Sequence, residues 1–333
     1  KDGILSFLAA CLLHDIGHFP YAHSLKELAI REHEEIAATM IEAEGELRDA
    51  VIKAGASPEK TAQIIDKDML TSDEETLLYR SILSGTLDPD KLDYLSRDGF
   101  FAGVPYGKQD TDYIISAMLL KDGHLCLQSE AISSVEQVLF SKYMMYKALY
   151  WHKGVRSATA MIKKALITAL KKGVIVYDDL YFIDDNEFAY LCKSKVGECE
   201  ALEMVEMVEH NELLERRAEK DYDPTGIIET KGRTPEDREA LERDVFNKLR
   251  GIYPQLKEYS VIIDIPEPIN FETHIKVVEP DGEVHDIESE RMVFSGEVSQ
   301  IFQKNLRIVG LYLPEFVKRA DAEKALKEVI NGR

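Results

Sequence analysis

Long apolar runs are absent from this 333-residue chain, and none approaches the roughly 18 residues that a membrane-spanning helix requires. The sequence also lacks a signal-peptide pattern. Its four cysteines are scattered, and Cys192 and Cys199 do not have the close spacing of a zinc knuckle. These absences favour free thiols in a reducing compartment, and we expect a cytoplasmic protein without a membrane partner.

Basic residues are scarce relative to acidic ones. The chain has 41 Lys and Arg against 61 Asp and Glu, which gives a net charge of −20. A surface of this sign repels the nucleic-acid backbone, so non-specific nucleic-acid binding is not expected. A small anionic substrate is still compatible with this charge if cations gather in one pocket. Hydrophobic content of 45% and charged content of 31% are typical of a folded globular protein.

The pattern of elements predicts a mainly α protein with a helical core and a smaller α+β C-terminal region. Residues 3 to about 170 read as nearly all helix, and the longest periodic stretch covers residues 134–170. A capping side chain followed by proline predicts that helices start after Ser57, Asp88 and Thr234. Residues 196–220 read as an acidic helix, whereas β-branched residues and a Pro-Asp-Gly turn predict strands further on. A last strand over residues 306–313 and a closing helix after it are also expected. We expect domains at residues 1–172 and 173–333. Because the chain begins at Lys1 inside an apolar helix, we also expect its native N-terminus to lie upstream.

Three histidines and one aspartate fall within ten residues at the end of the first apolar run: His14, Asp15, His18 and His23. Imidazole nitrogen and carboxylate oxygen are ligands for divalent first-row metals. Neighbouring side chains on a helix diverge by about 100° and rarely share a ligand, but they can converge where a helix ends. Gly17 lets the backbone turn at this point. The alternative is a polar turn that holds histidines without a metal.

The string HDIGHFPYAHS resembles the signature of the HD-domain phosphohydrolases, and in particular of their deoxynucleoside triphosphate triphosphohydrolase (dNTPase) branch. The resemblance implies a helical-bundle core and a divalent metal ion held in part by His14 and Asp15. It further implies that His18 acts in catalysis and that His23 contacts phosphate oxygens. The metal could be Mn, Mg, Fe, Ni or Zn.

A second segment, Asp88-Pro-Asp-Lys-Leu-Asp-Tyr-Leu-Ser-Arg-Asp98, matches the same branch. On a helix, Asp90, Tyr94 and Asp98 share a face, and Lys91 can reach the same cavity with its long stem. The alternative is an exposed helix with surface ion pairs. By resemblance, Asp90 completes the metal site, Lys91 and Tyr94 bind the triphosphate, and Asp98 accepts a hydrogen bond from the sugar hydroxyl.

A third segment places Lys142, Tyr146, Tyr150 and Lys153 on one helical stripe, which suits a phosphate and nucleoside wall. The alternative is that the tyrosines lie in the core and the lysines extend to solvent. The resemblance implies a phosphate contact at Lys142 and a tyrosine beside the sugar at Tyr150, with Tyr146 also binding substrate.

His33 and Glu34 resemble the catalytic histidine and its acidic neighbour in this family, and His33 falls on the apolar stripe of its helix. The family's metal site also includes a histidine upstream of the His-Asp pair. No histidine precedes His14 here, so that ligand either lies further upstream or is missing. Four other histidines, His124, His210, His274 and His285, are expected to be surface or structural residues.

The sequence therefore predicts metal-dependent hydrolysis of deoxynucleoside triphosphates (dNTPs) to deoxynucleoside and triphosphate, by a homo-oligomer, either dimer or tetramer. One alternative is a phosphohydrolase of the same fold that acts on a nucleoside monophosphate or a guanosine polyphosphate. The absence of a GYP motif after the His-Asp pair argues against a cyclic dinucleotide. Another alternative is a nucleotide-binding regulatory module without activity.

Overall fold

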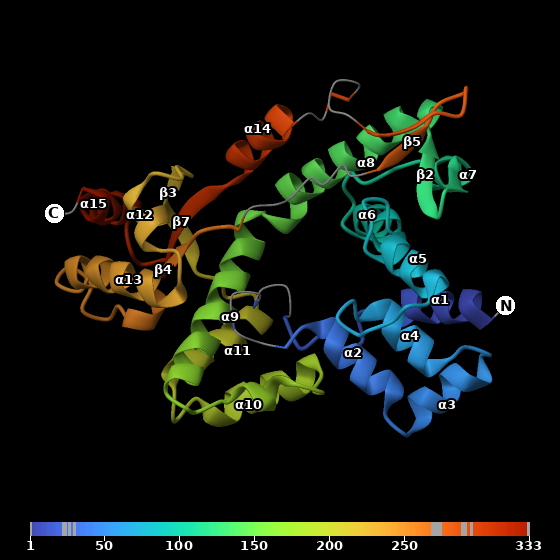
Figure 1. Ribbon diagram of the computed structural model, residues 1–333. Coiled ribbons are helices and arrows are strands. Elements are labelled where there is room, and N and C mark those ends of the chain that lie inside the picture. The colour runs from blue at the N-terminus through green and yellow to red at the C-terminus, as the bar shows by residue number, and fades with distance from the viewer. Residues whose placement is uncertain are drawn as a thin grey trace. The chain divides into compact units, whose positions relative to one another are not determined.

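The computed structural model describes residues 2–21, 25, 28, 31–267, 275–287, 292–293 and 296–331. It is mainly α-helical with two small sheets, which confirms the predicted fold class (Figure 1). None of the described helices is long and apolar enough to cross a membrane.

Two compact units interleave along the chain. The first comprises Lys1–His18, Arg31–Ala148 and Asn270–Gln300. The second comprises Phe19–Ile30, Leu149–Ile269 and Ile301–Arg333. The expected domains, by contrast, are continuous segments, and their boundary at residues 172 and 173 stays a prediction.

The first unit combines short helices with one mixed sheet. Its helices are α1 (Asp2–Leu13), α2 (His33–Glu42), α3 (Glu46–Lys53), α4 (Pro58–Ile65), α5 (Glu74–Leu83), α6 (Pro89–Phe101), α7 (Thr111–Ser116) and α8 (Ile132–Met145). Its strands are β1 (Met118–Lys121), β2 (His124–Gln128), β5 (Lys276–Val278) and β6 (Val284–Asp286). The sheet order is β1-β2-β5-β6, and β2 pairs with β5 in parallel.

Two helices of this unit begin where the sequence predicts. Ser57 and Asp88 are the N-caps of α4 and α6, and each accepts a hydrogen bond from a backbone N–H of the first turn. Proline follows each cap, because its missing N–H and fixed φ suit the first helical position. The helices α1, α2 and α4 pack through a cluster that includes the fully buried Ala10 and Ile41.

The expectation of nearly continuous helix up to residue 170 is wrong at β1 and β2. These strands pair antiparallel across Asp122 and Gly123, whose φ values are 52° and 75°. Such a two-residue turn with positive φ joins strands tightly and favours Asp-Gly. Gly282 also has a positive φ, 90°, and lies in the longer loop of the predicted hairpin between β5 and β6.

The predicted long helix over residues 134–170 is interrupted. α8 ends at Met145, a π-helical segment covers Tyr146–Tyr150, and α9 (Lys153–Lys171) begins after its N-cap His152. A π-helix turns more slowly than an α-helix, and a cap starts a new helix. The expected single stripe from Lys142 to Lys153 is therefore not continuous.

The second unit is built around α9 and an antiparallel sheet of order β3-β7-β4. Its other helices are α10 (Asp185–Lys195), α11 (Glu203–Glu209), α12 (Ile227–Lys231), α13 (Pro235–Leu249) and α15 (Arg319–Ile330). Its strands are β3 (Glu215–Asp221), β4 (Ile262–Asp264) and β7 (Ile308–Leu313). The helix α14 (Gly296–Leu306) crosses the division between the units.

The predicted acidic helix over residues 196–220 is wrong at its end, where β3 forms. This strand is rich in charged residues and carries a register shift between Arg216 and Ala218. An irregular edge strand does not show a simple alternation of apolar and polar residues, so the sequence pattern gave no strand signal. The predicted last strand and closing helix are confirmed as β7 and α15.

A buried ion pair joins α9 to β4 in the second unit. Arg156 Nε donates to Asp264 Oδ2 at 2.8 Å, and the guanidinium makes a second contact with Oδ1. The two side chains are only 14% and 5% exposed. Loss of one partner would leave a charge buried without compensation, which is far more costly than loss of an exposed pair.

We expect Arg156→Met to lower the free energy of unfolding by about 3–5 kcal/mol, because Asp264 then keeps a buried charge. The matched control is Arg97→Met, since Arg97 pairs with Asp93 at 2.6 Å but both side chains are more than half exposed. That change should lower the free energy by less than about 1 kcal/mol. Urea denaturation followed by circular dichroism measures both, and equal effects would contradict the structural role of the buried pair.

Candidate metal centre

The His-Asp pair lies where α1 ends, as the sequence predicts. α1 stops at Leu13, and the chain then turns through hydrogen bonds from Ile16 N to Leu13 O and from His18 N to Asp15 O. This turn breaks the helical spacing. As a result, the side chains of His14 and Asp15 converge, with 3.3 Å between His14 Nε2 and Asp15 Oδ1.

His14 is oriented for metal binding by the helix that carries it. Its Nδ1 lies 3.0 Å from the carbonyl oxygen of Cys11, so the ring donates a hydrogen bond there and presents the lone pair of Nε2 on the other side. Nε2 faces Asp15 and also lies 3.9 Å from Oδ1 of Asp90. One nitrogen and two carboxylate oxygens from these residues lie within 4.8 Å of one another, which fits a divalent cation.

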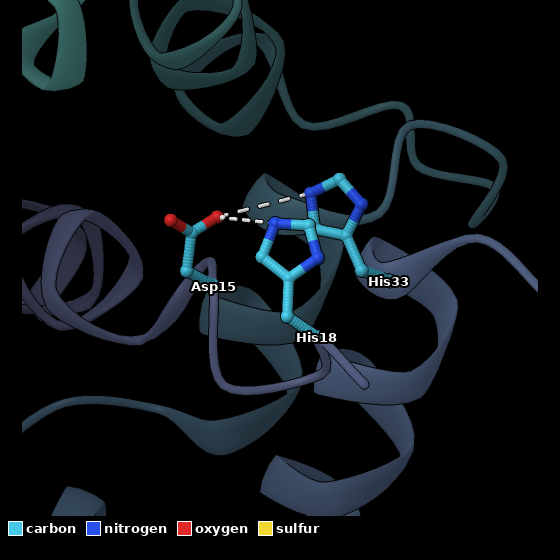
Figure 2. Close-up of side chains that lie close together, drawn as sticks. All are labelled: Asp15, His18 and His33. Carbon is cyan, nitrogen blue, oxygen red and sulfur yellow. Dashed lines mark ion pairs between the residues drawn. The ribbon is translucent and has the colours of Figure 1, made fainter. Parts of the chain in front are cut away.

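A second group shares Asp15 with the first. Asp15 Oδ1 lies 3.4 Å from His18 Nε2 and 3.8 Å from His33 Nε2. Figure 2 shows the two imidazole rings side by side, with one nitrogen of each directed at the same carboxylate oxygen. The rings are stacked with centroids 3.9 Å apart and an interplanar angle of 18°. His33 is the first residue of α2, so the group joins the α1 turn to that helix.

Gly17 permits this close approach between the turn and α2. A Cβ at this position would lie 2.0 Å from the carbonyl oxygen of His33 and 2.5 Å from the backbone nitrogen of Ala37. Both neighbours are helix backbone, which cannot move aside as a flexible side chain does. The glycine of the motif therefore sets the distance between His18 and His33.

Charge and burial shift the pKa values of Asp15, His33 and Asp90 in different directions. The hydrogen bond from His18 holds the pKa of Asp15 below its ordinary value, so Asp15 is an anion at neutral pH. Burial, together with the charge of His18, lowers the pKa of His33, so His33 is neutral and can accept a proton. His33 Nδ1 lies 3.0 Å from Glu34 Oε2. Burial raises the pKa of Asp90, which a bound cation would counteract.

Lys91 lies beside Asp90 in the first turn of α6. Its ammonium contacts Asp88 Oδ2 at 2.5 Å and donates to the carbonyl oxygen of Gly85 at 2.9 Å. Tyr94 follows Asp90 by one turn of α6 and lies close enough to Asp90 and Tyr146 for both groups to influence its ionisation. Burial is the main cause that raises the pKa of Tyr94. These contacts bring Lys91 and Tyr94 to the same part of the first unit as the metal group.

The other predicted site residues divide among three cases. Asp98, Lys142 and Tyr146 are half-buried residues of the first unit, and their substrate contacts stay predictions. Tyr150 belongs to the second unit, and its predicted place beside the sugar also stays a prediction. His23 lies outside the described residues.

Sequence reasoning missed two positioning features. The carbonyl of Cys11 gives no signal, because any residue one turn before His14 would supply the same oxygen. Asp88 was recognised only as an N-cap, although its second oxygen binds Lys91. A lysine three residues after an aspartate N-cap is the signal that could have indicated this pair.

Family models match nearly the whole chain. The HD domain matches residues 5–98, and the HD associated region matches residues 109–331, which is more than half of the chain. The chain belongs to the HD-domain phosphohydrolase superfamily.

Three relatives illustrate this membership. The uncharacterized protein YwfO of Bacillus subtilis (strain 168) is 32% identical over 160 residues, which cover 48% of this chain and 36% of that protein. A deoxynucleoside triphosphate triphosphohydrolase SAMHD1 homolog of Dictyostelium discoideum is 23% identical over 215 residues, covering 62% and 41%. A crystal structure of a phosphohydrolase from Bacteroides thetaiotaomicron VPI-5482 has the same fold, with a TM-score of 0.66, 21% identity and coverage of 95% and 81%. The matches thus span well under half of the curated relatives' length.

We expect His14→Ala and Asp90→Ala each to abolish bound divalent metal, because each removes one ligand atom of a three-residue group. Helical content should stay close to that of the unaltered protein. His285→Ala is the control, since His285 pairs with Glu279 on the β5–β6 hairpin instead. Elemental analysis of the purified proteins measures the metal. An unchanged metal-to-protein ratio in the two variants would contradict the assignment of His14 and Asp90 as metal ligands.

Gly17→Ala tests the close approach of the turn to α2. We expect a loss of about 1–3 kcal/mol in stability, because the added methyl group meets helix backbone that cannot give way. Gly197→Ala is the matched control, since a Cβ at Gly197 meets no atom within 4 Å. Thermal unfolding followed by circular dichroism compares the two variants. A Gly17→Ala protein as stable as the control would show that the turn does not lie against α2.

Proposed function

We propose that this protein is a metal-dependent phosphohydrolase that cleaves dNTPs to deoxynucleoside and triphosphate. The observation that carries the proposal is the double use of Asp15. Its carboxylate belongs to the metal-ligand group with His14 and Asp90, and it also contacts the stacked pair of His18 and His33. The cation site and two groups that can transfer protons, His18 and His33, therefore share the carboxylate of Asp15.

His14, Asp15 and Asp90 would hold the divalent cation. When bound, such an ion polarises a phosphoryl oxygen and compensates the charge that develops during displacement. Their donor set of one imidazole and two carboxylates suits Mn²⁺, Fe²⁺ or Zn²⁺ as well as Mg²⁺. Asp15 is kept anionic by His18, so no proton has to leave it before a cation binds.

His33 is the proposed proton-transfer residue. Its lowered pKa leaves it neutral, and its Nδ1 lies 3.0 Å from Glu34 Oε2. The Nε2 atom of His33 is then directed toward Asp15 and the adjacent cation site. His18 stacks on this ring and fixes its plane, and it also reaches the same carboxylate oxygen.

Lys91 would bind a phosphate oxygen of the substrate. It follows Asp90 directly, so the anion and the cation of the site lie on adjacent residues of one helical turn. In a chain of net charge −20, an ammonium at this place supplies attraction that the surface as a whole does not. The choice of dNTPs is supported by the Dictyostelium relative, whose name states this activity.

The test is to incubate the full chain with each dNTP and with Mn²⁺, Mg²⁺, Fe²⁺, Ni²⁺ or Zn²⁺, and to identify the products by mass spectrometry. We expect deoxynucleoside and inorganic triphosphate. His33→Ala should lower kcat by roughly 100- to 10,000-fold, because a positioned general acid or base contributes about that factor. His124→Ala is the control, since His124 lies at the start of β2 and is exposed.

Release of orthophosphate or pyrophosphate instead of triphosphate would move the assignment to another nucleotide phosphohydrolase. Tight nucleotide binding without turnover under every metal condition would favour a regulatory module. An unchanged kcat in His33→Ala would remove His33 from the reaction while leaving the metal site in place.

A further inference from the structure

Asp88 binds residue 91 twice, through both of its carboxylate oxygens. Oδ1 accepts a hydrogen bond of 2.6 Å from the backbone N–H of Lys91, which caps α6. Oδ2 contacts the ammonium of the same residue at 2.5 Å. The Asp88 side chain is only 9% exposed, whereas that of Lys91 is 26% exposed. The aspartate is thus the buried member of the pair, and the lysine is the member that solvent and ligands can reach.

The second partner of the ammonium is the carbonyl oxygen of Gly85, at 2.9 Å. An ammonium has three N–H donors, and these two contacts use two of them. The donor that is left has a set direction, because Asp88 and Gly85 hold the nitrogen from one side. Lys91 is therefore an oriented donor before any ligand arrives.

The ion pair with Asp88 also weakens the attraction between Lys91 and a phosphate. A phosphate oxygen bonded to the ammonium lies about 3 Å from the positive charge and about 5 Å from the Asp88 carboxylate. Because Coulomb energies fall as the inverse of distance, the repulsion cancels roughly half of the attraction. Asp88 thus has two opposite effects on phosphate binding, one through order and one through charge.

The relative size of these two effects decides whether Asp88 strengthens or weakens phosphate binding. Freezing a lysine side chain changes a binding constant by at most a factor of about 10 to 30, and Gly85 still supplies part of that order. Repulsion between unit charges about 5 Å apart changes the binding constant by about 200-fold at an effective dielectric constant near 20. The charge effect is the larger, so Asp88 weakens the binding of a phosphate chain at Lys91.

We propose that Asp88 is a positioning residue that orients Lys91 and moderates its charge, so that a bound triphosphate group is released. This inference rests on the proposed function, since triphosphate is a product only of that reaction. The buried carboxylate keeps its partner through the reaction cycle. Lys91 therefore presents one N–H in a fixed direction to the phosphate chain, and its ammonium does not move to make further contacts with the phosphates.

The test is Asp88→Ser, because serine also caps helices well but cannot reach the ammonium as a charged partner. Isothermal titration calorimetry with inorganic triphosphate, without added metal, measures the dissociation constant of the full chain. We expect binding to become about tenfold tighter, which corresponds to about 1.4 kcal/mol. Damage to the fold would weaken binding, so tightening is not a result that a purely structural role of Asp88 predicts.

Two further variants make the test specific. In a Lys91→Met background, Asp88→Ser should leave the dissociation constant unchanged, because Asp88 acts through Lys91. Asp184→Ser is the matched control, since Asp184 caps α10 in the same way and contacts no lysine within the part of the chain that the structure describes. That control should bind triphosphate like the unaltered protein.

Weaker or unchanged binding in Asp88→Ser would overturn the inference, and so would tightening that persists in the Lys91→Met background. Failure of the proposed function gives a different result. In that case the unaltered protein hydrolyses no dNTP, while Asp88→Ser still binds inorganic triphosphate more tightly. If the unaltered protein binds no triphosphate, Lys91 is not a phosphate contact and the inference falls.

Discussion

The turn after α1 and the first turn of α2 lie so close that only a hydrogen atom fits between them at Gly17. This constraint brings His33, which is distant in sequence, against His18 and Asp15. Without it, the metal-ligand residues and the proton-transfer residues would occupy separate places. A single carboxylate can serve both groups because two backbones touch at a point without a side chain.

Several elements were predictable because their signals are local. A capping side chain followed by proline marks the starts of α4, α6 and α13, and these helices begin at the expected residues. The β1–β2 hairpin was missed although Asp122-Gly123 is a local signal too, because its short strands lie within a helical stretch. β3 was missed because its partner β7 is distant in sequence and its own residues are mostly charged.

The candidate site was predictable to the extent that its residues are neighbours on one element. His14 and Asp15 share a turn, and Asp90 and Lys91 share a helical turn, so residue type and spacing suffice to propose each pair. That the two pairs meet is a matter of tertiary packing, and only the family resemblance indicated it in advance. The carbonyl of Cys11 was not predictable, because backbone oxygens carry no sequence signal.

The pairing of β2 with β5 has a consequence for the order in which the chain folds. Cys126 pairs with Lys276, and the whole of the second unit's longest segment, Leu149–Ile269, lies between them in the sequence. During synthesis the edge of β2 that pairs with β5 stays unpaired until that segment has left the ribosome. An unpaired strand edge can form incorrect pairings. The metal ligands His14, Asp15 and Asp90 are all translated long before β5. All residues of the cation-binding group are thus present in the nascent chain while the β1-β2-β5-β6 sheet of the same unit still lacks two of its strands.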